Sequence, residues 1–157
     1  MFQKKYYYLA YGSNLNLEEM SIRCPNAKAI GTVLLHGHHL IYKGSEDDYA
    51  YLTIERQNDS FVPLGLFEIT KSDIKKLDHY EGYPLLYEKR IIPILIDDKK
   101  VDALIYIMKE EYDYHLPCPS YIKTCKDGYT DFGFDHIYLE IALQETKDNL
   151  SKTKKRK

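Results

Sequence analysis

Glu81 is the acidic residue whose neighbours along the chain most favour acid–base chemistry. It directly follows Tyr80 and lies two residues before Tyr83. Aromatic neighbours reduce the hydration of a carboxylate, which raises its pKa toward the neutral range in which a general acid or base works best. Asp78, on the same face of a predicted helix, would raise the pKa further. The alternative is a solvated glutamate at a helix end. Judged from this segment alone, that alternative is favoured.

The segment Leu9–Leu15 connects an apolar, tyrosine-rich run to the start of a helix. Its Gly12 and Asn14 are residue types that tolerate positive φ. A turn built on them can point successive backbone N–H groups into one concavity, and the following helix adds unpaired N–H groups at its N-terminus. The segment therefore predicts a binding loop for a carboxylate or a carbonyl oxygen. The alternative is an ordinary strand-to-helix turn.

His36, His38 and His39 form the one cluster of histidines in the sequence. On a strand, His36 and His38 would face the same side, so a metal site with two histidine ligands is geometrically possible. No third ligand is evident, and we therefore predict exposed histidines and no bound metal. The sequence also contains no Gly-x-Ser-x-Gly nucleophile motif and no phosphate-binding Gly-x-x-x-x-Gly-Lys motif.

The composition is that of one globular domain. The chain has 157 residues, of which 44% are hydrophobic, with 16 tyrosines and no tryptophan; this is enough to fill a single core. No apolar run approaches the roughly 20 residues of a membrane span. The N-terminal Met1–Lys5 has no features of a signal peptide, so we expect a cytoplasmic protein. The three cysteines, Cys24, Cys118 and Cys125, are an odd number and are predicted to be free thiols.

The charge of the chain is unevenly distributed. The net charge is −2, and the C-terminal residues 151–157 include five Lys or Arg and no acid. Without this segment, 17 basic and 24 acidic side chains remain, a net charge of −7. Such a body is not typical of a nucleic-acid-binding protein. We therefore predict a domain over residues 1–150, followed by a basic, disordered tail over 151–157 that binds no nucleic acid.

Apolar periodicity, together with glycine and proline, predicts the elements that position these residues. Strands are predicted at 6–9, 29–42 (one bent strand or two short ones), 49–55, 63–69, 87–96 and 100–108, with turns at 57–60 and 97–99, and helices start at Asn16, at Thr70 or Ser72, at Ser120 and at His136. Short antiparallel steps with single inserted helices indicate an α+β fold. Strands interrupted by glycine indicate a small curled or closed sheet.

Four segments together resemble the gamma-glutamylcyclotransferase family. They occur in the family's order across residues 6–143, which is most of the chain. Leu9–Leu15 resembles the family's substrate loop, Leu64–Ile69 the strand before its catalytic segment, Leu77–Gly82 with Tyr87 the segment that holds its catalytic glutamate, and Pro119-Ser120-Tyr121 with Gly128 and Phe134-Asp135 its C-terminal pocket helix. Each motif is short, and the signal lies in their combination.

The resemblance implies a small closed, mostly antiparallel β-barrel with peripheral helices. It also implies a reaction in which a γ-glutamyl amide or amine is cleaved by its own α-amine, giving 5-oxoproline and a free amine or amino acid, with no metal or organic cofactor. At matching positions, Glu81 would be the acid/base. The glutamyl group would be held by the backbone amides of Tyr11, Gly12, Ser13, Asn14 and Leu15, and Tyr87 and Tyr121 would line the pocket.

Three questions stay open from the sequence. The leaving group can be an amino acid, an amine or a protected biosynthetic intermediate. A non-catalytic small-molecule binding module of the same fold is an alternative, which the presence of Glu81 disfavours. A nucleic-acid or ribosome-associated protein that binds through its tail is a further alternative, which the acidic body disfavours. We expect a monomer or a weak homodimer that acts on a small γ-glutamyl substrate and does not associate with membranes.

Overall fold

The computed structural model describes residues 4–45 and 48–155, with the side chains of 153–155 left out. Its elements in chain order are β1 (Tyr6–Ala10), η1 (Ser13–Leu15), α1 (Leu17–Arg23), β2 (Lys28–Gly44), β3 (Tyr51–Ile69), α2 (Lys71–Tyr80), β4 (Tyr87–Ile96), β5 (Lys99–Met108), β6 (Asp113–Tyr114), α3 (Pro119–Phe132) and α4 (Ile137–Lys155). The mixture confirms the predicted α+β class. None of the described helices is both long and apolar enough to span a membrane.

The strands form one six-stranded sheet in the order β4-β5-β1-β3-β2-β6. Neighbouring strands are antiparallel except β1 and β5, which are parallel. The sheet is bent but not closed, because β4 pairs only with β5 and the two-residue β6 pairs only with the end of β2. The predicted closed barrel is therefore not found within the described residues.

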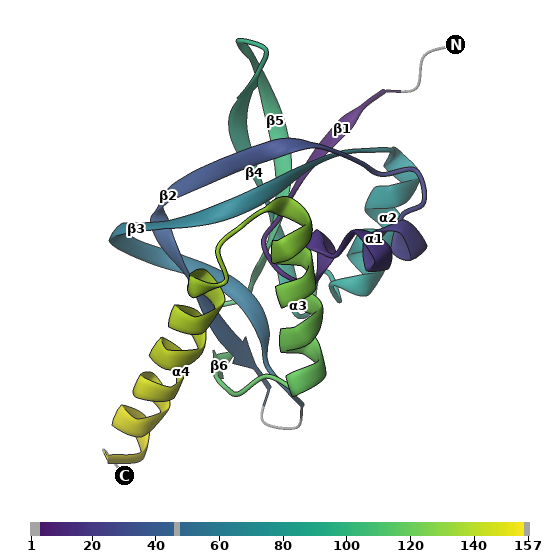
Figure 1. Cartoon of the computed structure of the whole chain (residues 1–157). Coiled ribbons are helices and arrows are strands. Elements are labelled where there is room, and N and C mark those ends of the chain that lie inside the picture. The colour runs from purple at the N-terminus through teal and green to yellow at the C-terminus, as the bar shows by residue number, and fades with distance from the viewer. Residues whose placement is uncertain (1–3, 46–47, 156–157) are drawn as a thin grey trace.

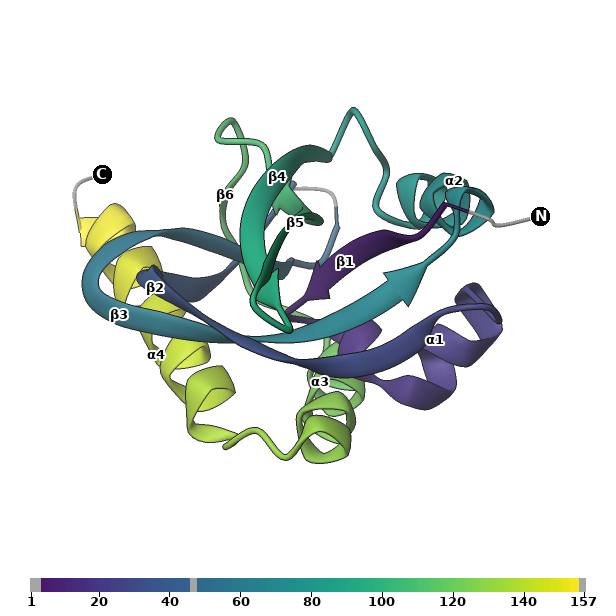
Figure 2. The ribbon, with the colours of Figure 1, turned by 90° about the horizontal axis from the view of Figure 1, so that it is seen from above.

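The long β2–β3 hairpin is the central element of the fold, and other elements pack on both of its sides. In Figures 1 and 2, α3 and α4 lie on one side of it and the β4–β5 hairpin lies on the other. The predicted turn at 57–60 is wrong, because β3 runs continuously from Tyr51 to Ile69. His36 pairs with Phe61 and His38 with Arg56, so residues 57–60 form a bulge opposite Gly37, whose φ is 73°. Their turn-forming residue types are thus used to bend the strand rather than to end it.

Helix ends follow their local signals in most places. Asn16 caps α1 by accepting a hydrogen bond from the Glu19 N–H at 3.1 Å, as predicted. Thr70 caps α2 in a capping box with Asp73. Helix α3 begins earlier than predicted, since Cys118 rather than Ser120 is its N-cap residue.

The last helix is longer than predicted. Helix α4 continues to Lys155, so residues 151–155 of the predicted disordered tail are helical, whereas 156 and 157 lie outside the described residues. The boundary drawn at residue 150 from the charge pattern therefore does not coincide with the end of this element. A charge pattern reports solvation, and a solvated segment can still continue a helix.

Two glycines let helix α3 pack closely against the turn that follows β1. A Cβ on Gly128 would lie 2.5 Å from the backbone nitrogen of Asn16, and a Cβ on Gly65 would lie 2.5 Å from Leu15 Cδ2. The side chain of Leu15 is fully buried beneath the turn. The turn is therefore held between the sheet and α3, which fixes its position at the cavity described below.

Candidate active site

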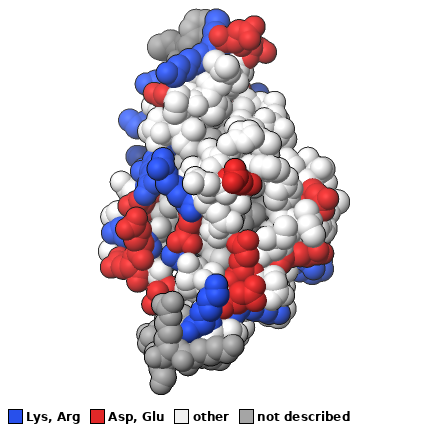
Figure 3. Space-filling model, turned by 90° about the vertical axis from the view of Figure 1, so that its left-hand side faces the viewer, with Lys and Arg blue, Asp and Glu red and all other residues white. Residues whose placement is uncertain are grey.

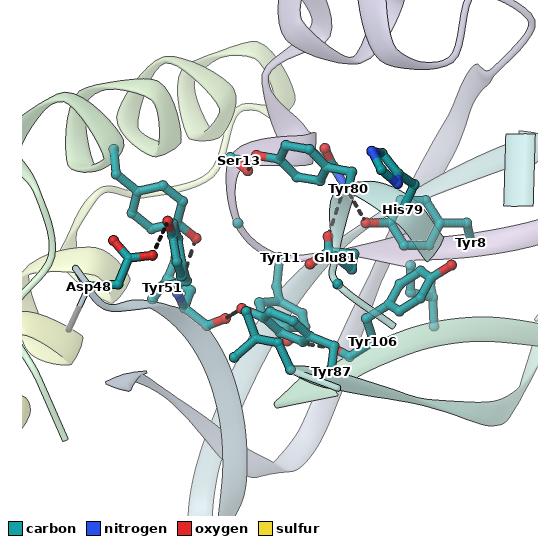
Figure 4. Close-up of a pocket in the computed structure, with 17 residues that line it drawn as sticks. Tyr8, Tyr11, Ser13, Asp48, Tyr51, His79, Tyr80, Glu81, Tyr87 and Tyr106 are labelled. Atoms are coloured by element: carbon teal, nitrogen blue, oxygen red, sulfur yellow. Dashed lines mark hydrogen bonds between the residues drawn. The ribbon is translucent and has the colours of Figure 1, made fainter. Parts of the chain in front are cut away.

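A cavity of about 270 Å³ lies where the end of β1 and the following turn meet the C-terminal end of α2 (Figure 4). Its walls include seven tyrosines and come from four strands, the turn, two helices and the loops beside them. The lining residues are Tyr8, Leu9, Tyr11, Gly12, Ser13, Asn14, Asp48, Tyr51, Leu52, His79, Tyr80, Glu81, Gly82, Leu86, Tyr87, Tyr106 and Tyr121. The structure thus brings together seven of the eight residues singled out from the sequence. Leu15 is the eighth, and its side chain lies in the core instead.

The turn after β1 differs from the expected conformation. Gly12 has φ −124° and ψ −133°, so positive φ is not used there, and Ser13 and Asn14 lie in a short 3₁₀ helix. A Cβ on Gly12 would lie 3.2 Å from the Tyr121 hydroxyl. The glycine is therefore explained by the narrow space at the cavity wall rather than by backbone conformation.

The turn still presents unpaired backbone donors. Its own hydrogen bonds run from the Leu15 N–H to the Gly12 carbonyl at 3.1 Å and from the Asn16 N–H to the Ser13 carbonyl at 3.0 Å. In the described part of the chain, the N–H groups of Gly12, Ser13 and Asn14 have no protein acceptor. Unpaired backbone donors beside a cavity can bind an anionic or carbonyl oxygen.

Glu81 directly follows α2 and is held by a backbone hydrogen bond to the Leu77 carbonyl at 2.8 Å. Its carboxylate oxygen Oε1 accepts a hydrogen bond from Asn14 Nδ2 at 3.2 Å. Burial raises the pKa of Glu81 from 4.5 to about 7, and the positive charge of Arg23 acts in the opposite direction. The group therefore exchanges protons near neutral pH, as expected from the sequence.

Asp78 does not act on Glu81 as expected. Its two carboxylate oxygens accept hydrogen bonds from the Tyr106 hydroxyl and, at 3.0 Å, from Lys89 Nζ. Among the described residues, Arg23 is the one charged group found to change the pKa of Glu81. Lys89 thus balances the charge of the Asp78 carboxylate, and Asp78 is not among the residues that line the cavity.

Buried tyrosines form the walls around Glu81. The Tyr11 hydroxyl donates to the Tyr106 carbonyl at 2.6 Å, and the Tyr87 hydroxyl donates to the Leu52 carbonyl at 2.7 Å. The Tyr121 hydroxyl accepts from the Leu52 N–H at 3.0 Å. Burial raises the pKa of each of these phenols, which keeps them neutral at physiological pH. The hydroxyls of Tyr11, Tyr87 and Tyr121 are thus bonded to the backbone, and Glu81 lies among them with a pKa near neutrality.

The sequence analysis missed Arg23, and it considered Tyr80 only as a neighbour of Glu81 along the chain. The Arg23 guanidinium carbon lies 3.3 Å from the centroid of the Tyr80 ring, and one of its nitrogens donates to Asn14 Oδ1. The Tyr80 hydroxyl is 3.0 Å from Ser13 Oγ. These contacts join the ends of α1 and α2, which are far apart in the sequence, so no local pattern indicated them.

The histidine cluster is not part of this site. His39 Nδ1 lies 2.5 Å from Glu145 Oε2, and His38 Nδ1 lies 2.9 Å from the His36 carbonyl. The bulge at Gly37 breaks the alternation by which His36 and His38 would share a face. Within the described residues no group of three or more potential metal ligands is found. The three cysteines are free, as predicted.

A second cavity, of about 550 Å³, lies beside His38 and His39 between the β2–β3 hairpin and the ends of β4, β5 and α4. It is lined by residues of both charges, among them Lys43, Glu55 and Arg56. Lys43 Nζ pairs with Glu55 at 2.7 Å. Figure 3 shows that basic and acidic side chains are interspersed on this side of the molecule. The second cavity is thus lined by side chains of both charges, whereas the carboxylates of Glu81 and Asp48 line the first.

Comparisons with known proteins identify the family of the chain. The sequence model of a family described as gamma-glutamyl cyclotransferase, AIG2-like, matches residues 8–123. A solved structure described as a gamma-glutamyl cyclotransferase is 22% identical, with a TM-score of 0.76, and the alignment covers 95% of this chain and 99% of that one. No curated protein matches the chain.

Two further solved structures are similar in fold. The uncharacterized human protein loc79017 is 24% identical with a TM-score of 0.77, over 89% of this chain and 87% of that one. A yeast gamma-glutamyl cyclotransferase specific to glutathione is 11% identical with a TM-score of 0.55, over 94% of this chain and 99% of that one. At these identities the likeness establishes the shared fold, and the family assignment depends on the sequence match.

Proposed function

Because the chain belongs to the gamma-glutamyl cyclotransferase, AIG2-like family, we propose that it cleaves a γ-glutamyl amide or amine by attack of the substrate's own α-amine. The products are 5-oxoproline and a free amine or amino acid. The observation that carries the proposal is the position of Glu81. It is a carboxylate with a pKa of about 7 in a cavity that also presents unpaired backbone N–H groups.

The reaction suits a site without a protein nucleophile. The attacking amine is already tethered to the γ-carbonyl carbon, and holding it in an attack geometry can be equivalent to about 10⁵–10⁸ M of free nucleophile. The aromatic walls of the cavity would fold the substrate into that geometry. The three free N–H groups of Gly12, Ser13 and Asn14 would bind the glutamyl group and stabilise the oxyanion that forms on the carbonyl.

Glu81 would transfer the protons. At neutral pH the α-amine is mostly ammonium, so a base must remove a proton before its nitrogen can attack the carbonyl carbon. The resulting tetrahedral intermediate breaks its bond to the leaving nitrogen, and that nitrogen must receive a proton to depart. The attacking nitrogen loses two protons in all, because the ammonium carries three and the nitrogen of 5-oxoproline carries one. A carboxyl group with a pKa near 7 can accept a proton from the attacking nitrogen and give it to the leaving nitrogen, and the other proton is taken up by the released amine, which is protonated at neutral pH.

The remaining predicted residues have supporting roles in this proposal. Tyr11, Tyr87 and Tyr121 would form the walls that hold the substrate. Leu15 would contribute little through its backbone, because its N–H is already bonded to the Gly12 carbonyl. Its buried side chain would instead fix the turn against the core.

The test is release of 5-oxoproline from a panel of γ-glutamyl amino acids and γ-glutamyl amines. Glu81→Gln is expected to reduce the chemical step by about 10²–10⁴-fold while preserving the fold. Glu88→Gln is the matched control, since Glu88 lies on β4 and pairs with Arg90 away from the cavity lining. It is expected to retain wild-type turnover. Full activity in Glu81→Gln would refute the mechanism, and no release by the wild type from any compound would favour a non-catalytic binding module.

A further inference from the structure

Arg23 is the last residue of α1, and its side chain is only 15% exposed. The flat face of its guanidinium lies on the Tyr80 ring at 3.3 Å, which stabilises a cation. One edge donates to Asn14 Oδ1, and the other lies 3.6 Å from a carboxylate oxygen of Glu19. Three different partners thus hold this guanidinium in one orientation.

The contact with Arg23 determines how the Asn14 amide is oriented. A guanidinium can only donate hydrogen bonds, so the group that faces it must be the oxygen Oδ1. The nitrogen Nδ2 is then directed to the other side, where it donates to the Tyr8 hydroxyl at 2.9 Å and to Glu81 Oε1 at 3.2 Å. The reversed amide would place an oxygen against the carboxylate and lose the hydrogen bond to Glu81, since an ionised carboxylate can only accept.

We propose that Arg23 is a positioning residue of the site: its guanidinium holds the Asn14 amide with its N–H toward Glu81 and supplies the positive charge that favours the ionised carboxylate. This inference rests on the proposed function for its activity readout only. Arg23 does not line the cavity and has no contact with the substrate in this scheme. It acts through Asn14 and through its charge.

The other elements around Glu81 contribute mainly tyrosines, whose phenols carry no charge at neutral pH. Strand β1 contributes Tyr8 and Tyr11, β4 contributes Tyr87, and β5 contributes Tyr106; burial raises the pKa of each phenol. Helix α3 contributes Tyr121, whose pKa is raised in the same way. His79 and Asp48 also line the cavity, but among residues 4–45 and 48–155 Arg23 alone is found to offset the effect of burial on Glu81.

Removing the guanidinium is therefore expected to raise the pKa of Glu81 from about 7 by about one unit. At pH 7, the ionised fraction would fall from about one half to about one tenth. Because the ionised form is the base, kcat/KM at that pH would fall about fivefold and recover near pH 9. A purely structural role for Arg23 would change activity equally at all pH values.

The experiment compares Arg23→Met, Arg23→Lys and Glu19→Gln. Methionine keeps the apolar stem but neither the charge nor the donors, whereas Glu19→Gln removes only the exposed partner of Arg23. The pKa of Glu81 is read from the carbon-13 chemical shift of its carboxyl carbon in a titration, assigned with Glu81→Gln. This readout needs no turnover, so a failure of the proposed function and a failure of this inference are distinguishable.

We expect the pKa of Glu81 to rise by about one unit in Arg23→Met, to rise less in Arg23→Lys, which keeps the charge but not the planar donor, and to stay unchanged in Glu19→Gln. Should Arg23→Met not fold, Arg23→Lys carries the test. A wild-type pKa in a folded Arg23 variant would overturn the inference. So would a pH-independent loss of kcat/KM with no change in the titration.

Discussion

Glu81 is a partly buried residue, and the desolvation of its carboxyl makes the stability of the protein depend on pH. In the folded state its pKa is about 7, compared with 4.5 for an ordinary glutamate. Below about pH 4.5 the group is protonated in both the folded and the unfolded chain, and it has no differential effect. As the pH rises toward 7, the unfolded chain releases this proton and the folded chain does not, so stability is lost progressively through that window.

The size of the effect follows from the shift. The two pKa values, 4.5 and about 7, differ by about 2.5 units. Each unit corresponds to about 1.36 kcal/mol, so the full penalty above pH 7 is roughly 3 kcal/mol. Glu81→Gln should remove it, because glutamine is uncharged, has nearly the same shape and can still accept the Asn14 hydrogen bond through its carbonyl oxygen.

The assay is a series of thermal melts of wild type and Glu81→Gln between about pH 4.5 and pH 8.5. The two proteins are expected to melt together at the acidic end. At the alkaline end, Glu81→Gln should melt roughly 6–12 °C higher, as expected for a difference of about 3 kcal/mol in a domain of this size.

The control for these melts is a glutamate at the surface of the protein. Glu88→Gln should follow the wild type at every pH, since its carboxylate is paired with Arg90 at the surface. A melting difference between wild type and Glu81→Gln that is the same at both ends of the range would refute the reasoning. It would mean that Glu81 is an ordinary, hydrated carboxylate in the folded protein.

Three further predictions concern the turn, the core beneath it and the end of α4. Gly12→Val should raise the KM for a γ-glutamyl substrate more than it lowers the melting temperature, because its Cβ would lie 3.2 Å from the Tyr121 hydroxyl at the cavity wall; an unchanged KM would show that substrate does not reach this wall. Gly65→Ala should lower the free energy of unfolding in urea by about 1–3 kcal/mol, since its Cβ would lie 2.5 Å from Leu15 Cδ2, and an unaltered midpoint would contradict this packing. Deleting residues 151–157 should leave turnover and the melting temperature unchanged, as residues 151 and 152 are exposed; a melting temperature several degrees lower would show that this end is docked.

Elements with a strong local signal could be predicted from the sequence. The capping box of Thr70 and Asp73 fixes the start of α2, and the predicted hairpin turn has φ of 50° at Asp97 and 64° at Asp98. These features depend on residues within three or four positions of one another. The closure of the sheet depends instead on whether distant edge strands meet, and the lengths of the edge strands that decide it have no local signature.

At residues 57–60 the sequence correctly indicates a change of chain direction but wrongly indicates the end of a strand. Residues 57–60 have turn-forming types, and they do change the direction of the chain. Because they lie opposite Gly37 on the paired strand, the bend is absorbed as a bulge while hydrogen bonding continues on both sides. The outcome is decided by the partner strand, which sequence periodicity within β3 does not include.

The candidate site also combines features that have a local signal in the sequence with features that depend on distant residues. Residue type makes Glu81 and the turn at 11–14 candidates, the family resemblance favours a functional role for both, and the fold brings them to one cavity. Their connection through Asn14, and the guanidinium of Arg23 behind it, depends on the packing of α1 against α2. Arg23 has no feature in the sequence that distinguishes it from a surface arginine at a helix end.

The pKa of Glu81 was predicted in the right direction for an incomplete reason. The sequence argument relied on the flanking tyrosines, yet Tyr80 and Tyr83 are 43% and 39% exposed in the structure. The cavity around Glu81 also contains the buried phenols of Tyr8, Tyr11 and Tyr87 from distant parts of the chain, and burial is the cause of the raised pKa. The flanking rings carry cations on their faces, Arg23 on Tyr80 and Lys89 on Tyr83. Residues next to a carboxylate in sequence are thus not necessarily those that dehydrate it, and a pKa inferred from flanking residues is secure only once the fold shows which groups surround the carboxyl.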